Sequence, residues 1–185
     1  APMTLAQVFE SMLQVGRAVG KEEHANTVVN AYQKRVDEVV LRSKQLAKKP
    51  RLVFLEWLDP PFSSGHWTPE LIAMAGGMEL LGKPGVPSRT LSWSEVADAK
   101  PEMLFIAACG FNVERTMQDL SVLDNVMMQK EFASLKPGKV FVADGSQYFN
   151  RPGPRLVDSL KILAHAIDPI VHPLPTYLHP ATKVN

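Results

Sequence analysis

FLEWLDPPFSSGHWTPELIAMAGG, residues 54–77, joins a short apolar run to an amphipathic helix pattern through a loop that contains two prolines. The apolar run belongs to RLVFLEW, 51–57, whose length and composition predict a strand. Thr68 followed by Pro69 is typical of a helix N-cap with proline at the first helical position, so we expect a helix over 70–75. A strand that leads into a helix through one loop is the repeating unit of an α/β fold.

Two more apolar runs continue this alternation. MLFIAA, 103–108, and KVFVADG, 139–145, predict buried strands, and Ser92 with Glu95 forms the capping-box pattern of a helix start. The other helices expected in this region cover 112–123, 127–135 and 151–167. Short apolar strands that alternate with helices indicate one parallel sheet with βαβ crossovers, so the fold class is predicted to be α/β.

The N-terminal segment, 1–49, is predicted to be helical and to precede the sheet. Its apolar residues recur at helical spacing, and Gly16 and Gly20 interrupt the pattern, which predicts a break or bend there. The period then resumes for about 25 residues, roughly 40 Å of helix. We therefore expect a long helix, then a single α/β lobe over 50–170, and an irregular proline-rich tail over 171–185.

Composition narrows the class of protein. Hydrophobic residues make up 45% of the 185 residues, which is enough for a packed core. Lys and Arg number 20 against 19 Asp and Glu, so the bulk charge predicts no nucleic-acid partner. No secretory signal pattern is visible at the start of the sequence, which leaves both a cytoplasmic and an extracytoplasmic location open. One cysteine, Cys109, excludes an internal disulfide.

The candidate binding residues lie in the loops that follow the three predicted strands. In an open parallel sheet, ligands bind outside the carboxyl ends of the strands. All three loops carry aromatic residues and two carry a polar or cationic one, as small-molecule sites require. These residues are Phe62, His66 and Trp67 in the first loop, Phe111 in the second, and Tyr148, Phe149 and Arg151 in the third.

Purely structural roles stay open for several residues near these strand ends. Trp67 can fix its helix onto the sheet, and His66 can be a solvated or capping residue. Cys109 has no base near it in the sequence, so we interpret it as a small buried residue rather than a nucleophile. The acidic residues beside the strand ends are typical of turns and caps. They are Glu56, Asp59 and Asp144.

No metal site and no catalytic set is predicted. Three histidines, at 165, 172 and 179, are spaced by seven residues, which is not a usual spacing for metal ligands. No phosphate-binding glycine loop, nucleophile elbow or zinc-protease motif occurs. We therefore expect a binding protein and not an enzyme.

Several segments together resemble the cobalamin-type, or class III, substrate-binding proteins of ABC importers, in the order in which that family carries them. The segments are MTLAQVFESMLQVGRAVGKEEHANTVVNAYQKRV, FLEWLDPPFSSGHWTPELIAMAGG, LSWSEVADAKPEMLFIAACGFNVERT and VFVADGSQYFNRPGPRLVDSLKILAHAI. PPFSSGHW and YFNRPGPR carry the resemblance most strongly. The wider class binds cobalamin, haem and ferric siderophores. Its members have two α/β lobes joined by a long rigid helix, with the ligand clamped between the lobes.

The resemblance runs from about residue 3 to residue 170 and covers the joining helix and the C-terminal lobe. It therefore implies that an N-terminal lobe precedes residue 1, or that a second chain completes the site. It implies a periplasmic or other extracytoplasmic location, ABC permease subunits as partners, and Glu70 as a permease-docking residue. It implies no cofactor, because cobalamin is the transported ligand.

The resemblance also assigns the ligand contacts. Aromatic rings would cover the apolar plane of a corrin, while Asn150 and Arg151 would bond to its amides. His66 as a cobalt ligand is not required by the family pattern. The cleft-facing residues that the resemblance implies are Phe62, His66, Trp67, Phe111, Tyr148, Phe149, Asn150 and Arg151. The leading hypothesis is binding of cobalamin or a related corrinoid. The alternatives are haem or a ferric siderophore, or a single-lobe protein-interaction module without a small ligand.

Overall fold

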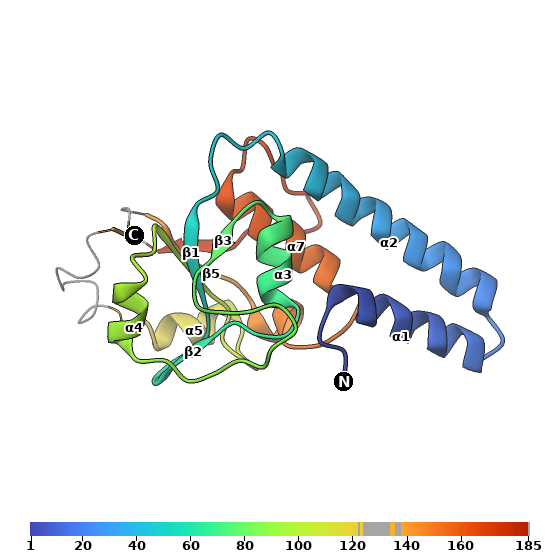
Figure 1. Ribbon diagram of the computed structural model, residues 1–185, viewed down its shortest axis with the longest axis horizontal. Helices are drawn as coiled ribbons and strands as arrows, with labels where there is room; N and C mark the ends of the chain where they lie inside the picture. The colour runs from blue at the N-terminus through green and yellow to red at the C-terminus, as the bar shows by residue number, and fades with distance from the viewer. Residues whose placement is uncertain (122, 124–133, 136–137, 185) are drawn as a thin grey trace.

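A computed structural model describes residues 1–121, 123, 134–135 and 138–184 of the chain. In it, a mixed sheet lies between two layers of helices, and a pair of helices extends away from the sheet (Figure 1). The helix expected over 127–135 lies almost wholly outside the described residues.

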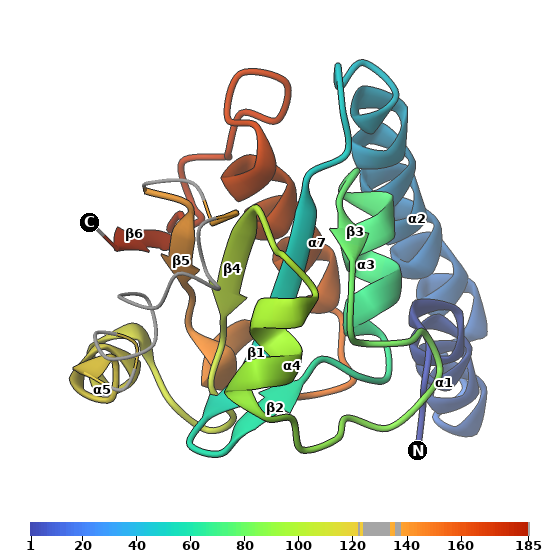
Figure 2. The same ribbon diagram turned by 60° about the vertical axis from the view of Figure 1, so that its left-hand side comes forward.

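The centre of the sheet is parallel, as the sequence predicts. The strand order is β2-β1-β4-β5-β6, with β3 also paired to β1, and the β1–β3, β1–β4 and β4–β5 pairs are parallel. Figure 2 shows these strands side by side. The strands are β1 Arg51–Leu58, β2 Pro61–Ser63, β3 Met78–Glu79, β4 Met103–Ile106, β5 Val140–Val142 and β6 Thr182–Val184.

The prediction of three strands in a purely parallel sheet is wrong at the edges. β2 pairs with β1 and β6 pairs with β5, both antiparallel. β6 lies in the tail that was expected to be irregular, so the tail prediction is wrong for residues 182–184. These added strands have two or three residues each, too few to show a period in the sequence.

Helices cover both faces of the sheet. On one face α1 Leu5–Ala18, α2 Glu22–Ser43, α3 Thr68–Met74 and α7 Leu156–Ile167 share a hydrophobic core with β1 and β4. On the other face α4 Trp93–Asp98 and α5 Val113–Gln118 flank a second core (Figure 2). A short π-helix, η2 Gly145–Phe149, follows β5, mostly where the sequence predicted a loop, and β5 ends at Val142 rather than at the predicted residue 145. All four residues of β4 are buried, because helices pack on both sides of it.

The predicted helix break is confirmed. α1 ends at Ala18 and the chain turns through Gly20, whose φ of 65° is the left-handed conformation that glycine adopts without strain. The 22 residues of α2 then run back along α1. A β-carbon on Gly16 would lie 2.3 Å from the β-carbon of Ala25, so the absence of a side chain there lets the two helices approach closely.

The helix of the opening stretch starts at Thr68, one residue before Pro69, which the sequence predicts as the first helical position. Thr68 is the first residue of α3 and is buried, while Trp67 takes the N-cap position without a side-chain capping bond. The prediction that Thr68 caps the helix is therefore wrong. Pro69 still lies within the first turn, where its missing N–H removes no helical bond.

One buried carboxylate joins β1 to the segment after β3. Oε1 of Glu79 accepts hydrogen bonds from the backbone N–H groups of Leu81 and Gly82, at 3.1 and 3.0 Å. Oε2 accepts one from the N–H of Phe54 at 3.1 Å. Burial outweighs these bonds and raises the pKa of Glu79 to about 7.

Candidate ligand-binding site

The carboxyl ends of β1 and β4 bring three aromatic side chains together. Trp57 and Phe62 are directly opposite in the antiparallel β1–β2 pair, so their side chains share one face. The ring centroid of Phe111, in the loop after β4, lies 4.8 Å from that of Trp57. We call Phe62, Trp57 and Phe111 the aromatic row. All three rings are half-buried, so each keeps an accessible surface.

A guanidinium group extends the aromatic row at Phe111. The guanidinium carbon of Arg115 lies 4.5 Å from the Phe111 ring centroid, within cation–π distance. Arg115 also pairs with Asp119 at 2.6 Å on the exposed side of α5. Asn112 caps α5, as predicted, by accepting a 2.8 Å hydrogen bond from the Arg115 N–H. The cap and the ion pair together fix α5 next to the ring.

Two hollows meet at Phe111. One, of about 240 Å³, is lined by residues of β1, the loop after β4 and α5, including Trp57, Asp59 and Thr116. The other, of about 350 Å³, is lined by Gly110, Arg115 and residues of η2. The ring of Phe111 therefore stands between two open spaces at the carboxyl edge of the sheet, which is where the sequence predicts a ligand.

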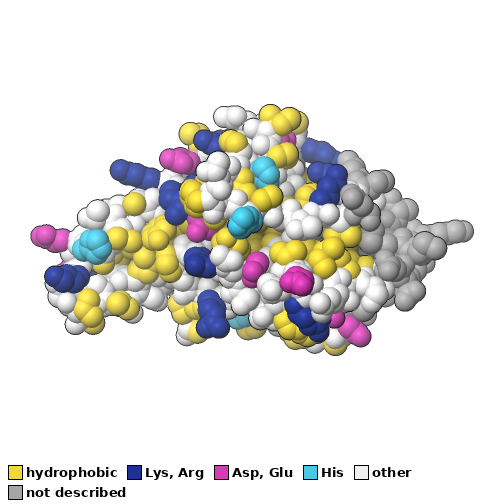
Figure 3. Space-filling view, turned by 180° about the vertical axis from the view of Figure 1, so that it is seen from behind, with side chains coloured by type: hydrophobic (Ala, Val, Ile, Leu, Met, Phe, Trp, Pro, Cys, Tyr) yellow, Lys and Arg dark blue, Asp and Glu magenta, His cyan; other side chains and the backbone are white. Residues whose placement is uncertain are grey.

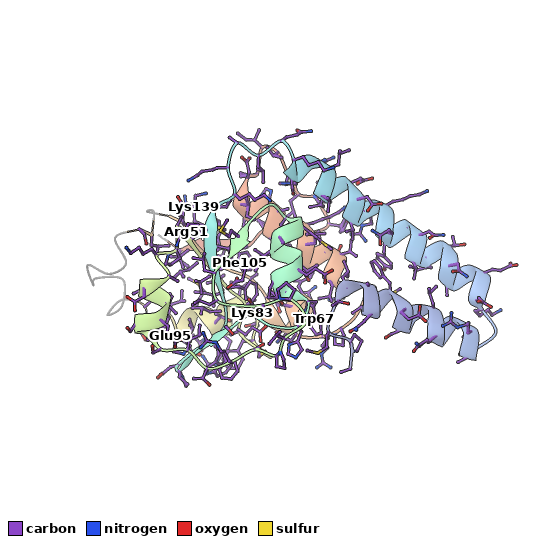
Figure 4. The ribbon with its side chains drawn as sticks, in the orientation of Figure 1. Arg51, Trp67, Lys83, Glu95, Phe105 and Lys139 are labelled. Atoms are coloured by element: carbon purple, nitrogen blue, oxygen red, sulfur yellow. The ribbon has the colours of Figure 1, made fainter. Side chains whose placement is uncertain are left out.

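Three of the predicted rim residues are instead in the core. The exposed fractions are 8% for Trp67, 7% for Tyr148 and 3% for Phe149. Trp67 Nε1 donates a 3.1 Å hydrogen bond to the backbone oxygen of Phe149. Figure 4 shows Trp67 at the start of α3, on the side of the sheet that α1 and α7 cover. The expectation that these rings stand open on the rim is wrong, because the first helix layer packs over them.

The hydrogen bond from Trp67 to Phe149 gives this loop tryptophan a structural role. The Phe149 ring packs at a tilt against the core rings of Phe54 and Phe105, at 5.3 and 5.7 Å between centroids. Trp67 therefore ties the loop after β1 to η2, two segments that are 82 residues apart. This is the structural role that the sequence left open for it.

The polar candidates are less enclosed. His66 is half-buried, with φ of 55°, and its backbone N–H and oxygen bond to Val86 and Gly85 at 2.8 and 2.9 Å. Arg151 is exposed at the end of η2. The Asn150 Nδ2 atom is buried and has no hydrogen-bond partner among the described residues.

A half-buried carboxylate, that of Glu56, holds the His66 loop in place. Glu56 lies at the irregularity between Leu55 and Trp57 in the β1–β2 pair. It accepts hydrogen bonds from the Gly65 N–H at 3.1 Å and from the Ser88 hydroxyl at 2.6 Å. Burial raises the pKa of Glu56, and these two bonds oppose that rise. Glu56 therefore shapes the loop between the row and α3.

Another acidic candidate, Asp144, is a cap. Asp144 caps η2 by accepting a 2.6 Å hydrogen bond from the Gln147 N–H. This is the turn-or-cap role that the sequence favoured for it. Within the described part of the chain, no group of three or more His, Cys, Asp or Glu residues could hold a metal ion.

Cys109 is exposed, so its expected burial is wrong. Partial desolvation and the nearby charge of Glu56 raise the pKa of its thiol. Because a thiolate is the reactive form, this environment disfavours a nucleophilic role.

Glu70, the proposed docking residue, has a contact within the fold. Its Oε2 atom accepts a 3.0 Å hydrogen bond from the backbone N–H of Leu5, the first residue of α1. A carboxylate at this position also interacts favourably with the helix dipole. Glu70 thus joins α3 to the start of α1.

Sequence reasoning missed Trp57 and Arg115. Trp57 was counted as part of a strand, and only the short return strand β2 shows that its ring faces Phe62. Arg115 lies three residues after the helix cap Asn112, a spacing that places it in the first turn of α5 and so close to the preceding loop.

A family model described as periplasmic binding protein matches residues 2–145. The chain belongs to the periplasmic binding protein family. This family consists of substrate-binding proteins that work with ABC importers, and not of enzymes. Membership implies an extracytoplasmic location, as the sequence resemblance predicted. The described helices include none that is long and apolar enough to cross a bilayer.

Curated relatives match at low identity. Vitamin B12-binding proteins of Vibrio cholerae are 19% identical over 164 residues, which is 85% of this chain and 54% of theirs. The chain therefore spans about half the length of the curated relatives it matches.

Solved structures show the same fold. The vitamin B12 binding protein BtuF of Vibrio cholerae has a TM-score of 0.71 at 16% identity, covering 94% of this chain and 64% of that one. The heme-binding protein RhuT of Roseiflexus sp. RS-1 has a TM-score of 0.71 at 20% identity, covering 92% and 65%. IsdE of S. aureus, complexed with heme, has a TM-score of 0.75 at 13% identity, covering 89% and 65%. The α/β fold predicted from the sequence is thus confirmed.

Proposed function

We propose that this chain is the ligand-binding C-terminal lobe, with the connecting helices, of an ABC-importer substrate-binding protein for cobalamin or a related corrinoid. The aromatic row at the carboxyl edge of β1 and β4 is the observation that carries the proposal. Three half-buried rings lie within contact distance or opposite one another there, with hollows on both sides of Phe111. The curated relatives named as vitamin B12-binding proteins support the choice of ligand.

The chemistry of the row suits a broad and partly apolar ligand. Aromatic side chains supply large contact areas whose burial is favourable. Arg115 at one end of the row and Arg151 after η2 are exposed donors for the amide oxygens at a corrin's edge. In this proposal Phe62, Trp57 and Phe111 contact the ligand. Trp67, Tyr148 and Phe149 support the loops from below.

The proposal includes a second wall and a membrane partner. One lobe covers only one side of a large ligand, so an N-terminal lobe or a second chain completes the cleft. We propose Glu70 as a docking residue for the permease, with its second carboxylate oxygen as the contacting atom, because Oε2 bonds to Leu5.

Calorimetric titration with cyanocobalamin tests the proposal. We expect heat and Trp fluorescence quenching for the chain joined to its second lobe, and weaker binding for the chain alone. Trp57→Ala should weaken the affinity by about tenfold or more, since a buried aromatic contact contributes about 1.5–3 kcal/mol. Tyr177→Leu, in the tail, is the matched control and should bind as the unaltered chain does. Absence of heat at millimolar ligand with both lobes present would refute the proposal.

Haem is the second candidate, because two of the similar structures are named as heme-binding or heme-complexed. His66 is the side chain beside Trp67 that would then act as the iron ligand. A Soret shift on adding haem that disappears in His66→Ala would favour haem over a corrinoid. A ferric siderophore would instead quench fluorescence without a Soret band. If no such ligand binds, the chain functions as an interaction module.

A further inference from the structure

A second cavity lies away from the aromatic row, between α2, α7 and the tail that follows α7. Its volume is about 380 Å³, larger than either hollow beside Phe111. None of its lining residues belongs to the row or to the hollows. They are Glu38, Val39, Arg42, Lys161, Ala164, His172, Pro173, Leu174 and Pro175.

Bonds between the three segments hold the cavity open. An ion pair between Arg35 and Asp158 joins α2 to α7. The same arginine donates a 3.2 Å hydrogen bond to the hydroxyl of Tyr177 in the tail. His165 Nδ1 donates a 2.9 Å hydrogen bond to the backbone oxygen of His172, which joins the tail to α7. The walls are therefore fixed before any ligand enters.

His172 forms a neutral part of the wall. It is buried, with its Nε2 atom 3.3 Å from the hydroxyl oxygen of Ser43. Ser43 donates its own proton to the backbone oxygen of Met74 at 2.8 Å, so Nε2 of His172 carries the hydrogen in this contact. Burial, followed by the charge of Arg42, lowers the pKa of His172, which keeps the ring uncharged at neutral pH.

Two cations on the lining are available to a ligand. Among the described residues, no hydrogen bond or ion pair occupies the side chain of Arg42 or of Lys161. The nearby Asp158 forms its ion pair with Arg35. Partial burial and then the charge of Arg35 lower the pKa of Lys161, while the charges of Glu38 and Asp158 oppose that shift. The lining carries two cations, Arg42 and Lys161, and one acid, Glu38. Its net charge is therefore one positive charge when His172 is neutral.

The rest of the lining is apolar. Val39 and Ala164 are buried and form the floor between the two helices. Leu174 and the prolines on either side of it form a wall from the tail. Figure 3 shows the rear face of the molecule, where basic and histidine side chains are interspersed with hydrophobic ones. A volume of 300 to about 1,000 Å³ with apolar walls and a few placed polar groups is typical of small-molecule sites.

We propose that this cavity binds a small organic carboxylate with an apolar body. Its carboxylate would lie between Arg42 and Lys161, and its apolar part against Val39, Ala164 and Leu174. The single excess charge matches a monoanion rather than a polyanion, and the apolar walls give an organic anion more contact than an inorganic one.

NMR titration of the full chain with benzoate tests the proposal, because each backbone N–H reports its own surroundings. We expect saturable shifts confined to the segments around residues 38–42, 161–164 and 172–175. Benzamide has nearly the same shape without the charge, and inorganic phosphate has the charge without the apolar body. Benzamide should bind at least about tenfold more weakly, since a charge-assisted hydrogen bond contributes about 1.5–3 kcal/mol. Phosphate should also bind at least about tenfold more weakly, because it buries no apolar surface against the walls.

Variants locate the binding to the two cations. Lys161→Met and Arg42→Gln should each weaken benzoate binding by about tenfold or more. Lys34→Met, on the exposed side of α2 and outside the lining, should leave it unchanged. The benzamide comparison needs no variant, so the test stands even if one of them fails to fold.

Any one of four results would overturn the proposal. Equal binding of benzamide would show that charge has no part, and equal binding of phosphate would show that the apolar walls have none. Shifts that do not saturate, or that are unaffected by both cation variants, would show that the anion does not bind in the cavity.

Discussion

Trp67 and Trp57 lie ten residues apart in the same stretch, and the same substitution should cost much more stability at Trp67 than at Trp57. Trp67 is buried and donates a hydrogen bond to Phe149, while Trp57 is half-buried and its Nε1 bonds to the backbone oxygen of Asp59 in an exposed turn. Trp67→Phe removes the donor and leaves the Phe149 oxygen buried and unpaired, at a cost of about 1–3 kcal/mol. The smaller ring also leaves a void, which adds about 1 kcal/mol.

We therefore expect Trp67→Phe to lower the free energy of unfolding by about 3 kcal/mol, a large share of the 5–15 kcal/mol typical of a domain. Trp57→Phe should lower it by less than about 1 kcal/mol, because water replaces the lost bond. Urea unfolding followed by far-UV circular dichroism measures both, without relying on tryptophan emission. If the two variants lose equal stability, or Trp57→Phe loses more, the assignment of Trp67 to the core and Trp57 to the surface is wrong.

Three further predictions concern the fold. Burial raises the pKa of Glu79 from 4.5 to about 7, so its stabilising contribution is complete below pH 4.5 and is lost as the pH rises through 7. Between pH 5 and pH 8 the unaltered chain should lose about 3 kcal/mol relative to Glu79→Gln, and a pH-independent difference in denaturant midpoints would contradict this. Ser92 and Glu95 form both bonds of the predicted capping box, so Ser92→Ala should cost about 1 kcal/mol in chemical unfolding; no change would show that the cap is not formed in solution. Gly16→Ala should lower the melting temperature, because its β-carbon would clash with Ala25 across the hairpin, whereas a raised value would mean that the helices are farther apart.

The central part of the fold could be predicted because its signals are local. The runs that became β1, β4 and β5 are apolar and bounded by turn residues, and the break between α1 and α2 lies at glycines. The edge strands could not be predicted, since two or three residues carry no period. β6 in particular lies in a proline-rich segment and depends entirely on pairing with β5.

The sequence predicts where the candidate site lies in the fold, but not which side chains face it. Parallel strands place their carboxyl ends together, so the sequence identifies the loops that meet there. It does not identify which ring of a loop turns outward. Trp67 and Phe149 turn inward because η2 brings a backbone oxygen within reach of the indole, and that contact spans 82 residues. Phe111 turns outward, and its partner Trp57 became visible only with the register of β2.

The pairing of β6 with β5 has a practical consequence for protein engineering. Lys183 lies opposite Phe141 in this pair. The three residues of β6, Thr182–Val184, cover one edge of β5. Truncation before Thr182 would expose the unpaired backbone N–H and C=O groups of β5, a strand of valine and phenylalanine. Exposed edge strands of this kind pair with other chains and aggregate. A shortened variant should therefore aggregate at concentrations where the longer one stays monodisperse in light scattering. Purification handles are accordingly better attached ahead of α1 than close behind β6.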